Sequence, residues 1–193
     1  MKKHFLYHIF PPDLFSGEEL DAILSAFKKV TFGKGDFLLM EGNAAHYYWF
    51  VETGFLRAYA VDTEGNDVST NFFTTGDIAI DWSSFFQRKP TKENIQALTE
   101  CICWQLDFDT FQHLFHGIET FRESGRARLV ASYFELKQHS VSLITDQAKD
   151  RYKRLLAEKP AIFQNVPLKQ IASYLGITDT SLSRIRKEVA QEK

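Results

Sequence analysis

Apolar side chains near the N-terminus follow a helical spacing. Ser16 and Glu19 stand at the two positions of a capping box, in which each side chain caps the backbone N–H of the other residue. The apolar residues that follow lie three or four positions apart, at Leu20, Ile23, Leu24 and Phe27. We therefore predict a short amphipathic helix that begins near Gly17 and ends before Gly33.

The pattern changes beyond Gly33, where short runs of β-branched and aromatic residues alternate with glycines. These glycines recur at Gly35, Gly42, Gly54, Gly65 and Gly76. Turn signals at intervals of about ten residues are typical of short antiparallel strands in a barrel or sandwich. The residues of Asp62–Asn66 favour a hairpin loop, and residues 95–107 are typical of one or two further strands.

From about Glu119 the apolar period becomes that of a long helix. One line of side chains repeats every seven residues, at Leu129, Leu136 and Leu143. A second line lies beside it, at Val130, Phe134 and Val141. One line would pack on the β-rich body and the other on a second copy of the chain, so we assign the three leucines to a dimer interface. The alternative is a helix wholly buried against its own domain.

A further helix is expected at about residues 146–158, because Lys159 precedes Pro160 and the residue before a proline resists helical geometry. The stretch Leu168–Lys187 then has the spacing of two packed helices. Ala172 is small enough for close approach, and Gly176 permits a tight turn. The apolar positions of these two helices are Ile171, Leu175, Leu182, Ile185 and Val189.

The second of these helices would begin with Thr178 or Asp179 as its N-cap. Its outward positions suit a helix in the DNA major groove, where Arg184 would make a bidentate contact to guanine. We assign the DNA contacts to Thr178, Asp179, Thr180, Ser181, Ser183, Arg184 and Lys187. The alternative is a helical hairpin that serves folding or protein contacts only.

Charge and composition narrow the function. The formal net charge is −2, yet residues 149–193 hold ten Lys or Arg against five Asp or Glu, as expected of a polyanion-binding module on an acidic body. No apolar run is long enough to span a bilayer, and the N-terminal apolar stretch is too short for a signal peptide, so we expect a cytoplasmic protein with no membrane partner. The 2 cysteines, expected to be buried thiols, and the 6 scattered histidines predict no cofactor and no metal.

The sequence resembles the catabolite-activator (CRP/FNR) family of transcription regulators. The segment LSRIRK is similar to the family's recognition-helix core, and GFLRAY and TTGDIAI resemble strands and turns of its cyclic-nucleotide-binding β-roll. The resemblance covers nearly the whole chain. It implies an α+β fold: a cupin-like antiparallel β-roll, a long dimerisation helix and a C-terminal all-α helix-turn-helix domain. The expected boundaries are residues 1–117 for the sensor, 118–144 for the helix and 145–193 for the DNA-binding domain.

The resemblance implies a regulator and not an enzyme. Such a protein would bind palindromic double-stranded DNA as a homodimer, with RNA polymerase and a small-molecule effector as further partners. Family members often carry a two-stranded wing after the recognition helix. The residues up to Lys193 leave no room for one, so we expect weaker clamping of the DNA backbone.

The effector site departs from the family pattern. Relatives that bind cyclic nucleotides present a Gly-Glu pair to the ribose and an Arg-Ser or Arg-Thr pair to the phosphate. This sequence has Ile80-Asp81 and Thr91-Lys92 there, and lysine lacks the planar fork that holds two phosphate oxygens. We therefore expect an effector other than cyclic AMP. Its pocket would be formed by Phe73, Ile80, Asp81, Trp82, Arg88, Thr91 and Lys92. Packing without a ligand is the alternative for the aromatic residues.

Two other functions fit parts of this pattern. A metal-dependent β-barrel enzyme of the cupin type would need clustered His and carboxylate ligands on neighbouring strands, and His46 stands alone there. A sensor or adaptor whose helical tail binds protein in place of DNA is the closer alternative. Salt dependence of DNA binding separates it from a regulator, because phosphate contacts weaken steeply with salt.

Overall fold

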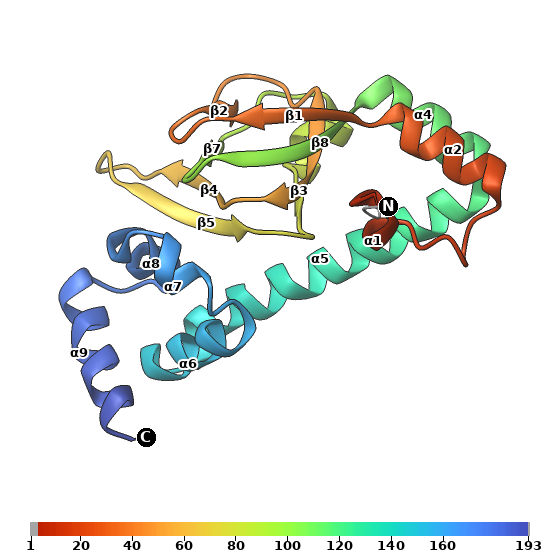
Figure 1. The fold of residues 1–193 in the computed structure, drawn as a ribbon. Coiled ribbons are helices and arrows are strands. Elements are labelled where there is room, and N and C mark those ends of the chain that lie inside the picture. The colour runs from red at the N-terminus through yellow and green to blue at the C-terminus, as the bar shows by residue number, and fades with distance from the viewer. Residues whose placement is uncertain (1–3, 193) are drawn as a thin grey trace.

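The computed structural model describes residues 4–192 and shows a β-roll followed by a helical C-terminal half (Figure 1). The strands are β1 (Lys28–Phe32), β2 (Phe37–Leu39), β3 (Tyr47–Thr53), β4 (Leu56–Val61), β5 (Asp67–Phe73), β6 (Ile78–Ala79), β7 (Asn94–Ala97) and β8 (Cys101–Asp107). They form two 4-stranded antiparallel sheets, with the orders β1-β8-β3-β6 and β2-β7-β4-β5. The predicted hairpin at Asp62–Asn66 joins β4 to β5, where the Asp62 N–H donates to the Asn66 carbonyl over 2.9 Å.

Helices flank the roll and form the C-terminal half. They are α1 (Leu6–Ile9), α2 (Gly17–Ala26), α3 (Trp82–Gln87), α4 (Phe108–Gly117), α5 (Glu119–Thr145), α6 (Ala148–Glu158), α7 (Ile162–Asn165), α8 (Leu168–Tyr174) and α9 (Asp179–Gln191). The predicted capping box begins α2, with Ser16 and Glu19 each accepting from the other's backbone N–H. The α6 helix ends before Pro160, as expected. The α+β fold is thus confirmed.

Aromatic rings fill the interior of the roll. The Tyr48 ring meets those of Phe50, Phe85 and Phe111 edge-on, with ring centroids 5.6, 5.6 and 6.0 Å apart. Edge-to-face contacts of this kind add to the free energy gained by burying the rings. Cys101 and Cys103 are free and buried, as the sequence indicates.

A second core lies among the C-terminal helices. The five apolar positions predicted for the two packed helices are all buried: Ile171, Leu175, Leu182, Ile185 and Val189. Phe72 of β5 belongs to this core and packs on Tyr174 of α8, with ring centroids 5.4 Å apart. The helical half therefore packs directly on the β2-β7-β4-β5 sheet, as Figure 1 shows for α8 and β5.

The long helix α5 runs below the roll toward the C-terminal helices (Figure 1). Within α5 only Phe121 and Ser142 are buried, so the alternative of a wholly buried helix is wrong. The six side chains of the two predicted lines stay at least 40% exposed, so neither line is buried on the β-rich body as one was expected to be. Tyr133 and Ile144 are exposed as well, which gives eight residues: Leu129, Val130, Tyr133, Phe134, Leu136, Val141, Leu143 and Ile144. We call these eight residues the apolar strip of α5.

Candidate nucleic-acid interface and sensor cavity

A turn built around Gly176 joins α8 to α9. Its φ of +66° lies in the left-handed region that favours glycine, and a Cβ there would stand 3.1 Å from Leu143 Cδ2 of α5. Thr178 caps the next helix, since its Oγ1 accepts from the Ser181 N–H over 3.2 Å. Of the two predicted N-caps the structure therefore selects Thr178, and the two helices have the connection of a helix-turn-helix.

Helix α9 has one buried and one exposed face. The predicted DNA-binding residues are all exposed: Thr178, Asp179, Thr180, Ser181, Ser183, Arg184 and Lys187. Thr180, Arg184 and Lys187 lie three or four positions apart, so they share one side of the helix. The Arg184 side chain is 83% exposed, with its Nε 3.5 Å from Glu188 Oε1. This side of α9 is open to a partner.

Acidic residues neutralise part of the basic charge of the C-terminal half. The Nζ atoms of Lys149 and Lys153 lie 2.5 and 2.6 Å from the two carboxylate oxygens of Glu192. Hydrogen bonds from these lysines lower the pKa of Glu192 to about 2. Within residues 4–192, Arg186 and Lys187 form no salt bridge. Helix α9 therefore keeps free positive charge beside its exposed face.

Hydrogen bonds fix the helix-turn-helix to strand β5. The Ser69 N–H donates to Ser173 Oγ over 3.1 Å, and the Ser69 hydroxyl donates to the Gln170 carbonyl over 2.9 Å. Lys159 donates to the Phe72 carbonyl over 3.0 Å. The two bonds of Ser69 join β5 to α8, the first helix of the motif. A displacement of β5 would therefore also displace α8.

A second connection joins α8 to the end of α5. The rings of His139 and Tyr174 are stacked, with centroids 4.1 Å apart and an interplanar angle of 9°. Arg151 donates from Nη2 to the Leu175 carbonyl over 2.9 Å. Burial lowers the pKa of His139, and the positive charges of Arg151 and Arg154 lower it further. The imidazole of His139 is therefore held neutral in this contact.

Two residues expected at the cyclic nucleotide site, Asp81 and Thr91, are hydrogen-bonded to each other. Asp81 caps α3 by accepting from the Ser84 N–H over 3.0 Å, and its second oxygen accepts from the Thr91 hydroxyl over 2.5 Å. Burial raises the pKa of the neighbouring Glu93, and the charge of Asp81 adds to the shift. A phosphate bound here would lie beside the carboxyl groups of Asp81 and Glu93. The Thr91 hydroxyl could not donate to it, because it already donates to Asp81.

Three other predicted pocket residues take no part in the hydrogen bonds of Asp81 and Thr91. Arg88 has a φ of +56° and donates to the Ala45 carbonyl over 2.7 Å, with its guanidinium carbon 4.4 Å from the Phe108 ring centroid. Lys92 is exposed, and Phe73 is buried in the core of the roll. The structure therefore does not bring the seven predicted residues together.

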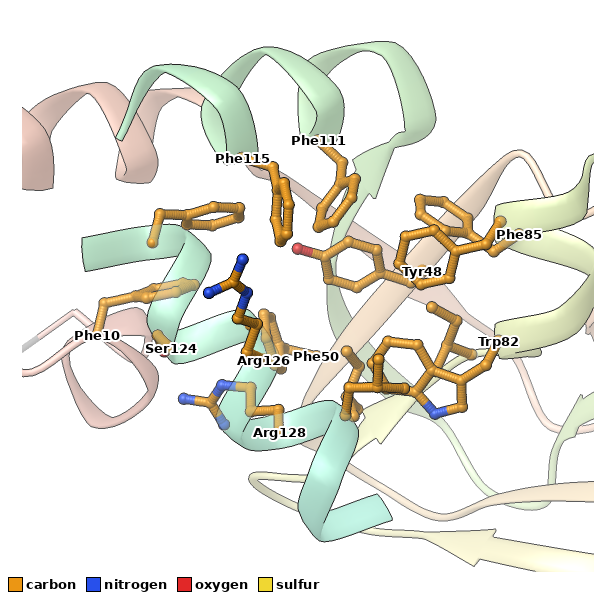
Figure 2. Close-up of a pocket in the computed structure, with 16 residues that line it drawn as sticks. Phe10, Tyr48, Phe50, Trp82, Phe85, Phe111, Phe115, Ser124, Arg126 and Arg128 are labelled. Atoms are coloured by element: carbon orange, nitrogen blue, oxygen red, sulfur yellow. The ribbon is translucent and has the colours of Figure 1, made fainter. Parts of the chain in front are cut away.

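An apolar cavity of about 210 Å³ lies between α3, α4, α5 and the roll (Figure 2). Ile80 and Trp82 line it, and they are the two predicted pocket residues that do so. Sequence reasoning missed Tyr48 and Arg128, which also line it. Arg128 lies in a helix with many charged residues, where the local sequence predicts an exposed side chain. No local pattern therefore pointed to a cavity at Arg128.

Among residues 4–192, no three His, Cys, Asp or Glu side chains are grouped to hold a metal ion. None of the helices described in this range combines the length and hydrophobicity of a bilayer-spanning segment.

The β-roll, the long helix and the helix-turn-helix follow one another along the chain. The family model of the cyclic nucleotide-binding domain matches residues 29–117, which run from β1 to the end of α4. FixK2 from Bradyrhizobium japonicum has a similar structure, with a TM-score of 0.74 and 16% identity over 86% of this chain and 85% of that one. The c-di-GMP responsive global regulator CLP from Xanthomonas campestris gives a TM-score of 0.71 and 14% identity over 92% and 93%. The chain therefore has the fold of the CRP/FNR transcription regulators, as the sequence resemblance predicts.

A curated relative matches part of the chain. The cAMP-dependent protein kinase regulatory subunit of Candida albicans is 25% identical over an alignment of 102 residues that covers 50% of this chain. The match spans only 21% of that protein's length.

Proposed function

We propose that this protein is a cytoplasmic, sequence-specific transcription regulator that binds palindromic DNA as a homodimer. Residues 1–117 would form the sensor, residues 118–144 the dimerisation helix and residues 145–193 the DNA-binding domain. RNA polymerase is a further candidate partner. The observation that carries the proposal is the exposed side of α9, where Thr180, Arg184 and Lys187 stand opposite a buried apolar face.

The exposed side of α9 has the chemistry that major-groove recognition requires. Arg184 offers a planar fork that matches the two acceptors of guanine, and the hydroxyl of Thr180 can reach a base edge or a phosphate. Lys187 supplies charge for the backbone, where position matters less. Burial of Leu182 and Ile185 against α8 holds these groups outward.

The homodimer is supported by the apolar strip of α5. Phe134 and Leu136 are 63% and 62% exposed, and an isolated monomer rarely leaves so much apolar surface open. Two copies joined along the strip would present two α9 helices related by a two-fold axis. A palindromic site matches that symmetry.

The effector is proposed to be a molecule other than cyclic AMP. The hydrogen bond between Asp81 and Thr91 uses groups that stand where relatives contact the nucleotide. Arg88 is also engaged, by the Ala45 carbonyl and the Phe108 ring. The corner therefore offers no free bidentate donor for a cyclic phosphate.

Selection of binding sites from random DNA, followed by fluorescence anisotropy on the enriched palindrome, tests the proposal. Arg184→Ala should weaken specific binding by about 1–3 kcal/mol and relax the preference at one base of each half-site. Lys187→Ala should weaken binding more uniformly across sequences. Arg186→Ala is the matched control, since it removes the same charge outside that side of α9. If Arg184→Ala and Lys187→Ala both leave binding unchanged, the recognition face is wrongly assigned.

The dimer has its own test by sedimentation equilibrium. Leu136→Glu should convert dimers to monomers, because it places a charge in the middle of the apolar strip. Gln138→Glu adds the same charge to an exposed position outside the strip and should leave the dimer intact. A wild-type chain that stays monomeric at high micromolar concentration would contradict the proposal.

A further inference from the structure

The cavity beside α3 is large enough for a small organic molecule. Its volume is about 210 Å³, whereas an engineered hole of about 150 Å³ in another protein's core binds benzene. The walls are mostly aromatic, with rings from Phe10, Phe50, Phe85, Phe111 and Phe115 (Figure 2). Transfer of one aromatic ring or a short hydrocarbon chain from water into this mostly apolar cavity would therefore be favourable.

A buried hydroxyl interrupts this apolar wall. Tyr48 is 4% exposed, and its hydroxyl points among the rings in Figure 2. Burial raises the pKa of Tyr48 well above its usual range, although the nearby charge of Arg128 opposes the shift. The hydroxyl therefore stays protonated and is a hydrogen-bond donor to a ligand.

A guanidinium is the second polar group of the wall. Arg128 lies over the rings of Phe50 and Phe10, with its guanidinium carbon 5.4 and 5.9 Å from their centroids. One Nη atom donates to the Ile9 carbonyl over 2.5 Å, whereas the buried Nε has no hydrogen-bond partner among the described residues.

This guanidinium also lacks an anion. No Asp or Glu of residues 4–192 forms a salt bridge with Arg128. Arginine does not lose its proton in proteins, so the cavity wall holds a positive charge that nothing in the described chain neutralises. Arg128 is half-buried, and a charge partly removed from water is costly unless a partner supplies the missing negative charge.

We propose that this cavity binds a small amphipathic carboxylate. Its ring or hydrocarbon chain would lie among the phenylalanines, and its carboxylate would accept hydrogen bonds from Arg128 and Tyr48. Arg126, the other arginine of the wall, is paired with Glu123 over 2.9 Å, so one carboxylate matches the remaining charge and the planar fork of Arg128. The inference deepens the proposed function by naming the class of effector, and depends on it only for the consequence that binding has on DNA.

Titration calorimetry on the full chain tests the site directly. Phenylacetate and octanoate are the two probes, and phenylacetamide and octanamide are their neutral counterparts. We expect at least one carboxylate to bind about tenfold or more tightly than its amide, because a hydrogen bond to a charged group is stronger than a neutral one. Trp82 lines the cavity, so its fluorescence should change on binding.

Variants locate the carboxylate. Arg128→Met should weaken binding by about tenfold to hundredfold. Arg122→Met is the matched control: it removes the same charge from the same helix at a residue that pairs with Glu119 over 3.4 Å, and it should leave binding unchanged. If Arg128→Met fails to fold, Tyr48→Phe keeps the ring and should weaken binding at least about threefold.

The inference is overturned if neither carboxylate binds at up to about 10 mM, or if amides bind equally well. It is also overturned if Arg128→Met, or Tyr48→Phe in its place, leaves affinity unchanged. Operator binding is measured separately, without these ligands. If the protein does not bind operator DNA, the proposed function is wrong but the carboxylate site is unaffected. If no carboxylate binds, the site is wrong but DNA binding is unaffected.

Discussion

Arg57 and Arg128 are both shielded from solvent, the first fully and the second in part, and their surroundings differ. Arg57 of β4 is 1% exposed, and its Nε donates to Ser69 Oγ over 2.8 Å. Its Nη1 lies 2.6 Å from Asp67 Oδ2, and its Nη2 donates to the Asp67 carbonyl over 3.2 Å. Arg128 of α5 has one backbone acceptor, a buried Nε without a partner and no carboxylate.

Arg57 therefore has a structural role, whereas the charge of Arg128 is available to a ligand. The hydrogen bonds of Arg57 continue through Ser69 to the Gln170 carbonyl of α8, so this network holds the sensor and the helix-turn-helix together. Because Arg57 is buried while Asp67 is 45% exposed, the larger cost is expected where Arg57 is lost and its buried acceptor Ser69 is left without this donor. Arg128 has no such network, and its charge is free to attract a ligand.

The largest effect is expected at Arg57. Arg57→Met should lower the free energy of unfolding by about 3 kcal/mol, because it leaves Ser69 and Asp67 without their donor. Urea denaturation followed by circular dichroism measures the change, with exposed Arg186→Met as a control that should stay within about 0.5 kcal/mol. A loss below about 1 kcal/mol would mean that the network contributes little to stability.

A smaller effect is expected at Arg128. Arg128→Met should change the free energy of unfolding by less than about 1 kcal/mol, because relief of an unpaired buried charge offsets the lost hydrogen bond to Ile9. The same urea experiment compares it with Arg57→Met. Equal losses for the two variants would show that Arg128 is as structural as Arg57, and the contrast would be lost.

The smallest effect is expected at His139, a base that lies beside the positive charges of Arg151 and Arg154. Its folded pKa is lowered by burial and by Arg151 and Arg154, so below about pH 6.5 the unfolded chain binds a proton that the folded chain resists. Stability contributed by neutral His139 is therefore present above that pH and lost as the pH falls.

The difference between stability at pH 7.5 and pH 5.5 should consequently be smaller in His139→Gln than in the wild-type chain. His8→Gln, at an exposed histidine, is the control and should keep the wild-type difference. The relevant quantity is the change with pH, because His139→Gln also removes the stacking on Tyr174 at every pH. Equal pH dependence in wild type and His139→Gln would contradict the assignment.

Sequence patterns predicted the elements whose causes are local. The capping box at Ser16, the loop at Asp62–Asn66 and the proline at Pro160 each act over a few residues, so α2, the β4–β5 hairpin and the end of α6 could be derived. The helix-turn-helix was predictable for the same reason, since Gly176 and its apolar neighbours determine the turn and the packing together.

Long-range contacts could not be derived in this way. Arg57 lies between buried Leu56 and Ala58, so strand alternation would place it on a solvent face. That face is covered by α8, whose Gln170 lies 101 residues after Ser69. The predicted effector pocket followed the family's phosphate site, and only Ile80 and Trp82 of its residues line the cavity. Nothing in the local sequence shows that the Thr91 hydroxyl donates a hydrogen bond to Asp81.

DNA recognition by α9 is tested most directly by a salt titration of the wild-type chain on its selected palindrome. The logarithm of the association constant should fall linearly with the logarithm of the salt concentration, because Lys187, Arg184 and their copies in the dimer displace counterions from phosphates. Scrambled DNA of equal length should bind at least about a thousandfold more weakly at physiological salt. Equal affinity for both DNAs, or no dependence on salt, would contradict recognition by α9 and favour a helical tail that binds protein.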